Sequence, residues 1–228
     1  MRIGYLLFPR LTQLDLTGAY EVLARLPEVE SLLVAATRDR VWSDTGMALT
    51  PDATFADAPP LDVIVVPGGP GATEAMIDPA TLDFVSHAGE RAAWVTSVCT
   101  GALVLGAAGL LRGYRATTHW TSMELLPYFG AIPVHERVVI DRNRMTGGGV
   151  TAGIDFGLTL AAAIAGRAVA EGIQLNLEYV PAPPFTSGSP ETAPADVVER
   201  YQAGRTVIHQ RRTEHAKDAA KRLGIVVK

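Results

Sequence analysis

Three short segments of strand character constrain the fold of this 228-residue chain more than any other feature. They cover residues 3–8, 61–66 and 94–97, and a polar or glycine-rich turn and then a helical segment follow each. The first is a continuous apolar run, which is typical of a strand buried on both faces. Strands that alternate with helices form parallel sheets. The sequence therefore predicts an α/β fold with a mostly parallel central sheet and helices on both faces.

The turns after these strands hold the residues best suited to chemistry. The carboxyl ends of parallel strands meet at one edge of the sheet, where open α/β folds bind ligands. We therefore expect Asp15, the pair Gly68–Gly69 and Cys99 to lie close together. Asp15 also stands where the first helix begins, and the alternative role for it is a helix N-cap.

Cys99 is the only cysteine of the chain and lies where a strand gives way to a helix. The amides of a helix N-terminus favour a thiolate, so the thiol is expected to ionise easily and to act as a nucleophile. The amide of Thr100, the next residue, would then stabilise developing negative charge, as in hydrolase elbows. The alternative is a cysteine that only packs in the core.

Further candidates stand near these turns. The amides of Gly68 and Gly69 either form a tight turn or join the amide of Thr100 in binding negative charge. His119 ends another short strand and either pairs with Cys99 or packs under Trp120. Gly148 belongs to a triple glycine that permits unusual backbone angles and could border the site.

Composition excludes several classes of function. The net charge of −4 gives no general attraction to nucleic acid or to anionic membranes. A single cysteine cannot form an internal disulfide, and no apolar run reaches the length of a membrane span or signal peptide, so a cytoplasmic location is expected. No metal-ligand spacing and no nucleotide motif occurs, so the sequence predicts neither a metal nor a cofactor.

The C-terminal part differs from the rest. Residues 179–194 are rich in proline, serine and threonine and are too long for a simple turn, so they are expected to wrap the surface or to reach a partner subunit. Residues 195–223 are predicted to form one solvated helix whose basic residues, Arg211 and Arg212 among them, alternate with acids. We divide the chain into an α/β domain, 1–185, and an extension, 186–228, that packs on this domain or on a dimer partner.

Several motifs resemble a known family. Residues 97–101, 67–69 and 116–120, together with Asp15, resemble the ThiJ/PfpI superfamily, relatives of the class I glutamine amidotransferases. Within it, the combination of residues 14–17, the elbow at 97–101, and residues 130–139, 146–149 and 178–185 is similar to bacterial isocyanide hydratases. The resemblance implies a flavodoxin-like sandwich, a homodimer, Cys99 as nucleophile, Asp15 as its acidic partner and Thr100 hydrogen-bonded near them.

The resemblance also implies a reaction. Water adds to an isocyanide and gives an N-substituted formamide through a thioimidate on Cys99, with Asp15 as acid and base. Thr100 stands where the peptidase branch has histidine, and Asp15 where many members have glutamate; both departures favour hydration over a protease or deglycase activity. One alternative is a glyoxalase or deglycase that acts on reactive carbonyls. A second is the sensor half of a transcription regulator, although this chain is expected to be too short to include the DNA-binding domain. A third is a redox sensor in which Cys99 becomes oxidised.

Overall fold

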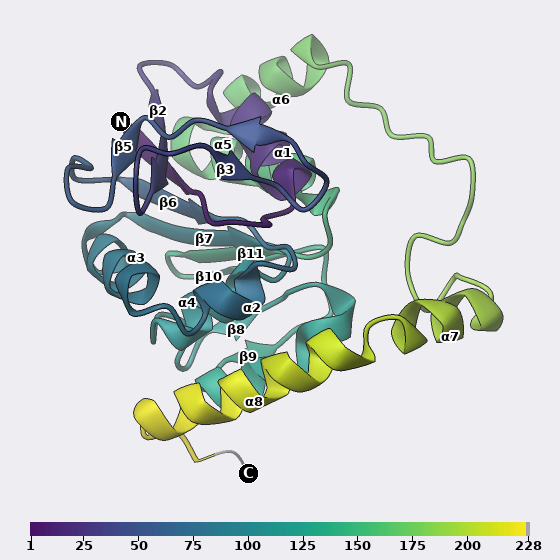
Figure 1. The fold of residues 1–228 in the computed structure, drawn as a ribbon. Coiled ribbons are helices and arrows are strands. Elements are labelled where there is room, and N and C mark those ends of the chain that lie inside the picture. The colour runs from purple at the N-terminus through teal and green to yellow at the C-terminus, as the bar shows by residue number, and fades with distance from the viewer. Residues whose placement is uncertain (227–228) are drawn as a thin grey trace.

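A seven-stranded sheet forms the centre of the computed structural model, which describes residues 1–226 (Figure 1). The strands lie in the order β10-β11-β7-β6-β1-β2-β5. All neighbouring pairs are parallel except the β10–β11 hairpin, so the predicted mostly parallel sheet is confirmed. The strands are β1 (Arg2–Leu6), β2 (Glu30–Ala35), β5 (Ala53–Thr54), β6 (Val63–Val66), β7 (Trp94–Val98), β10 (Val138–Asp141) and β11 (Arg144–Gly147).

Helices cover both faces of this sheet (Figure 1). One layer contains α1 (Gln13–Leu23), α5 (Ala152–Ala165) and α6 (Arg167–Asn176). The other contains α2 (Ala72–Ala75), α3 (Pro79–Arg91) and α4 (Gly101–Ala107). The central strand β6 is apolar throughout because both of its faces are buried, and every one of its residues is inaccessible to solvent. Each such side chain contributes about 1.5–3 kcal/mol by leaving water.

Short elements join this framework. Residues 38–55 contain the antiparallel hairpin β3 (Val41–Trp42) and β4 (Ala48–Leu49). A second small sheet pairs β8 (Arg115–Ala116) with β9 (Ile132–Pro133). Between them lies a 3-10 helix, η1 (Trp120–Phe129), which our sequence analysis did not predict. Among the described residues, no helix combines the length and the apolar character needed to cross a bilayer.

The C-terminal part corrects two expectations. The single helix predicted over 195–223 is two helices, α7 (Ala195–Ala203) and α8 (Thr206–Arg222). The expected solvated helix is wrong for α8, which lies against η1, α2 and α4 and buries Arg212, Ala216, Ala219 and Ala220. The segment before α7 loops out clear of the body as an extended chain (Figure 1), and its Val180 and Phe185 are 80% and 77% exposed.

Candidate active site

Cys99 stands at a strained turn between β7 and α4. Its φ angle is 57°, a left-handed conformation that costs a residue with a side chain about 1–2 kcal/mol. Three hydrogen bonds hold it there: the Cys99 amide donates to the carbonyl oxygens of Gly147 (3.0 Å) and Gly148 (2.8 Å), and the Thr118 hydroxyl donates to the Cys99 carbonyl (2.8 Å). The predicted strand-to-helix elbow is confirmed, and the side chain remains 5% exposed.

Asp15 lies in the first turn of α1 and is completely buried. The N-cap of that helix is Thr12, so the cap alternative for Asp15 is wrong. The Gly68 amide donates to Asp15 Oδ2 over 2.9 Å, whereas Oδ1 has no nitrogen or oxygen partner in the described part of the chain. Burial raises the pKa of Asp15 to about 7, although the Gly68 amide and the Cys99 thiol favour the charged form.

The thiol of Cys99 ionises less easily than a free cysteine. Burial, and then the negative charge of Asp15, raise the pKa of the Cys99 thiol well above its ordinary value. The Thr100 amide and the positive charge of Arg212 act in the opposite direction. The expected easy ionisation is therefore wrong, because removal from water outweighs the helix N-terminus. At neutral pH the thiol keeps its proton, and a carboxyl group that titrates near pH 7 lies beside it.

Gly68 and Gly69 connect the acid to Thr100. The Gly69 amide donates to Thr100 Oγ1 (3.0 Å), and this hydroxyl donates to the Gly69 carbonyl (3.2 Å). A Cβ atom on Gly68 would lie 2.6 Å from Thr100 Oγ1 and 2.9 Å from Asp15 Oδ2, so only glycine fits between these side chains. The amides of Gly68 and Gly69 thus already bind Asp15 and Thr100. Their direct contact with a substrate stays a prediction.

His119 borders the site without bonding to the cysteine. Its Nδ1 lies 2.8 Å from Thr121 Oγ1, and its ring stacks on Trp120 and Tyr201 at centroid distances of 5.8 and 6.3 Å. Burial, followed by two nearby arginines, lowers the pKa of His119 to about 4, so the ring is neutral at neutral pH. This geometry favours packing and lining over a dyad with Cys99.

A cavity of about 60 Å³ lies over Cys99. Its floor is the edge of the sheet, and its roof comes from α7, α8 and the two-residue connection between them. The roof residues are Tyr201, Arg205 and Arg212. None of the three is predicted from the sequence as a site residue. The available signal was the spacing of Arg212 with Ala216, Ala219 and Ala220, which places them on one helix face and is typical of a buried stripe.

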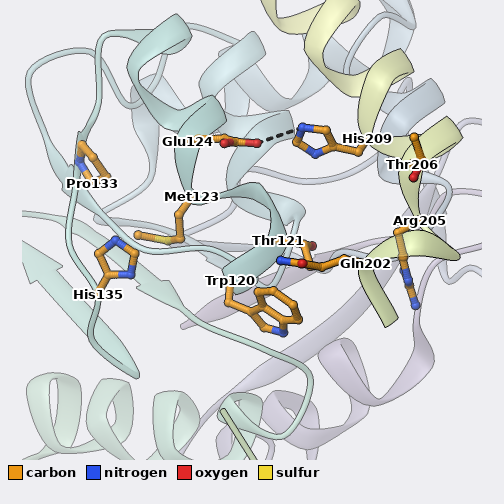
Figure 2. A pocket seen from close by; sticks show the side chains of 10 residues that line it. All are labelled: Trp120, Thr121, Met123, Glu124, Pro133, His135, Gln202, Arg205, Thr206 and His209. Carbon is orange, nitrogen blue, oxygen red and sulfur yellow. Dashed lines mark ion pairs between the residues drawn. The ribbon is translucent and has the colours of Figure 1, made fainter. Parts of the chain in front are cut away.

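A second cavity, of about 510 Å³, adjoins the first because Thr121 and Arg205 line both (Figure 2). Its wall is largely apolar around Trp120, Met123 and Pro133, and a Glu124–His209 ion pair of 2.8 Å closes another side.

Gly148 lies in a third cavity, of about 460 Å³, which His119 also lines. The Gly148 carbonyl accepts a hydrogen bond from the Cys99 amide, and the Gly148 amide donates to the Arg137 carbonyl (2.9 Å). Gly148 therefore supports the elbow. No cluster of three potential metal ligands occurs within residues 1–226.

A doubly wound α/β fold with a cysteine at a strand-to-helix elbow beside a buried acid defines a class of cysteine-centred α/β proteins. The model of the DJ-1/PfpI family matches residues 1–163. The chain belongs to the DJ-1/PfpI family, and the resemblance seen in the sequence is confirmed.

Three known proteins are similar to the chain. It is 55% identical over 225 residues to an isonitrile hydratase from Pseudomonas putida, with 99% of each chain covered. A crystal structure of a ThiJ/PfpI family protein from Pseudomonas syringae matches with a TM-score of 0.93 and 45% identity, over 94% of this chain and 90% of that one. The transcriptional regulator GbdR of Pseudomonas aeruginosa is 30% identical over 185 residues, which cover 78% of this chain and 50% of the regulator.

Proposed function

We propose that this protein is an isocyanide hydratase, a lyase that adds water to an isocyanide (isonitrile) and releases an N-substituted formamide. The observation that carries the proposal is the 55% identity to an isonitrile hydratase over nearly the whole of both chains. The pairing of a protonated thiol with an acid that titrates near pH 7 supplies the chemistry this reaction needs.

The first step joins sulfur to the isocyanide carbon. Ionised Asp15 accepts the thiol proton as the S–H bond breaks and the new S–C bond forms. Asp15 then delivers this proton to the same carbon, which carries the negative charge left by the attack. The product is a thioimidate on Cys99, and Asp15 is again a carboxylate.

The second step uses the same carboxylate as a base. Asp15 takes a proton from water as the water oxygen bonds to the thioimidate carbon, and passes it to the substrate nitrogen. The C–S bond of this tetrahedral species then breaks, the hydroxyl proton returns to sulfur by way of Asp15, and formamide leaves. Asp15 is then again a carboxylate and Cys99 again a thiol, so the enzyme returns to its starting state.

The two adjoining cavities suit the two ends of such a substrate. A volume of about 60 Å³ corresponds to roughly two waters at about 30 Å³ each, which is room for the two-atom isocyano group. The neighbouring cavity of about 510 Å³, with Trp120, Met123 and Pro133 on its wall, takes the neutral organic substituent. We expect aryl isocyanides to be accepted.

We also propose a cytoplasmic homodimer that binds neither nucleic acid nor membranes. The long exposed segment before α7 supports contact with a second copy, since Val180 and Phe185 are left in solvent. In the proposed division, domain 1–185 carries the reacting groups and extension 186–228 closes the cavity over them.

Phenyl isocyanide incubated with the purified protein tests the function, with formation of the formamide as the readout and Cys99→Ala as the control. We expect turnover by the wild type and none by the variant. Methylglyoxal is assayed beside it, because consumption of methylglyoxal without isocyanide turnover would favour a glyoxalase or deglycase. The similarity to GbdR favours a second candidate, a ligand sensor, and binding of an isocyanide without turnover would support that role.

A further inference from the structure

Arg212 is a buried charge that forms no ion pair with the described residues. Its side chain comes from α8 and is 4% exposed. Its Nε donates to Thr73 Oγ1 over 3.0 Å, and its Nη2 donates to the Gly69 carbonyl over 2.8 Å. Among residues 1–226 it forms no ion pair, whereas the adjacent Arg211 pairs with Glu74 on the surface. An unpaired buried charge is costly, and a guanidinium does not lose its proton in proteins.

The negative charge that Arg212 can compensate lies in the reaction site. Arg212 lines the same cavity of about 60 Å³ as Cys99 and Thr100. The other charged or titratable groups near this cavity come from separate elements and have contacts of their own. Asp15 of α1 accepts from the Gly68 amide, and Asp44 of the β3–β4 turn accepts from Thr12 over 2.8 Å. Arg205 lies over the Tyr201 ring, His119 lies against Thr121, and Glu74 pairs with Arg211. The thiolate formed at Cys99 during attack places a negative charge in this same cavity.

Arg212 also reaches the nucleophile through the backbone. The Gly69 carbonyl accepts two hydrogen bonds, from Arg212 Nη2 and from Thr100 Oγ1. Thr100 follows Cys99 directly, and its amide favours the thiolate. The guanidinium therefore fixes the carbonyl that fixes the Thr100 side chain.

We infer that Arg212 is a positioning residue that holds the Gly69–Thr100 pair and whose charge favours the thiolate that Cys99 becomes during attack. Docking of α8 then completes the active site, although α8 lies more than 100 residues beyond the elbow. The inference rests on the proposed function only for the reaction that the thiolate serves; the effect on the thiol itself is independent of the substrate.

The test is the pH dependence of alkylation of Cys99 by iodoacetamide, followed by intact-protein mass spectrometry. With one cysteine in the chain, the added mass reports a single thiol. Arg212→Met removes the charge and keeps an unbranched apolar side chain, a replacement that often leaves stability intact. Arg212→Gln is measured in parallel, so that the test stands if the methionine variant does not fold. Arg211→Met is the matched control, because it removes the same charge from the next position of the same helix.

We expect both Arg212 variants to react about tenfold more slowly than the wild type at neutral pH, with the alkylation profile moved toward higher pH. Arg211→Met should follow the wild type. An unchanged profile in the Arg212 variants, or an equal shift in Arg211→Met, would overturn the inference. The value of kcat/KM for phenyl isocyanide should fall in step with alkylation. If the wild type hydrates no isocyanide, the proposed function fails while the alkylation result still decides the role of Arg212.

Discussion

The edge of the sheet and the C-terminal helices reach the same cavity by different routes. Asp15, Gly68 and Cys99 lie together because each follows a strand of one parallel sheet, and the topology leaves them no other place. Arg212 lies there because α8 packs against η1, α2 and α4, and Tyr201 lies there because its ring packs on Trp120 and His119. The difference teaches that chemistry at this site comes from strand ends, whereas cavity shape and electrostatic tuning come from tertiary packing. Substitutions in the first region should remove activity, and those in the second should adjust it.

The largest effect is expected for Asp15→Asn. Asparagine keeps the acceptor for the Gly68 amide but cannot exchange a proton with the thiol, so kcat/KM for an isocyanide should fall by about 10²–10⁴. Steady-state formamide production measures this. Asp44→Asn, at a carboxyl group that lines the cavity over Cys99, is the control and should stay near the wild type. Comparable losses in both variants would remove the special role of Asp15.

The same acid should make stability depend on pH. Its pKa is about 7 in the folded protein and near 4 in the unfolded chain, so its contribution is full below pH 4 and is lost as the pH rises through 7. This loss lowers the free energy of unfolding by about 4 kcal/mol. Urea unfolding at several pH values should show this loss in the wild type and not in Asp15→Asn, which should be the more stable protein at pH 8. Parallel curves for the two proteins would show that Asp15 is not held neutral by burial.

Gly68→Ala tests whether activity depends on the close spacing of Asp15 and Thr100 around this glycine. The added methyl group would crowd Asp15 Oδ2 and Thr100 Oγ1, and a displacement of about 1 Å at reacting groups costs on the order of 10² in rate. We expect kcat to fall by about that factor. Gly172→Ala, where an added Cβ meets no atom within 4 Å, should keep full activity and gain roughly 0.5–1 kcal/mol of stability as a helix residue. Wild-type kcat in Gly68→Ala would contradict the geometry.

The smallest effect is expected in the roof. Tyr201→Ala removes the ring that packs on Trp120 at 5.6 Å and on His119, and such aromatic pairs contribute about 0.5–1.5 kcal/mol each. KM for phenyl isocyanide should rise several-fold while kcat stays within about threefold. Val207→Ala, at a side chain of α8 that is mostly exposed, serves as the control. A loss of kcat as large as that of Asp15→Asn would place the roof among the reacting groups and erase the contrast between the two regions.

The sequence predicts the sheet and the meeting of Asp15, Gly68 and Cys99, because apolar runs and strand-end turns are local features with a fixed consequence in a parallel sheet. It does not predict the ionisation of Cys99. A helix N-terminus contributes about 0.3–1 kcal/mol, and full burial of a thiol opposes it with more, yet burial depends on packing. The role of the C-terminal helices as the roof of the cavity is not predicted either, because it also depends on packing. The charges of α8 suggest a solvated helix, and Arg212 is buried only because α8 packs on the domain.

The central claim is that ionised Asp15 takes the proton of a neutral Cys99 thiol, and the pH dependence of kcat/KM for phenyl isocyanide tests it most directly. Because the pKa of Asp15 is about 7, the rate should rise with pH through neutrality and level off above it, with roughly one-hundredth of the plateau left at pH 5. Asp15→Asn should show no such rise. A wild-type rate that is flat across this range, or that increases only where the thiol itself ionises, would contradict the account.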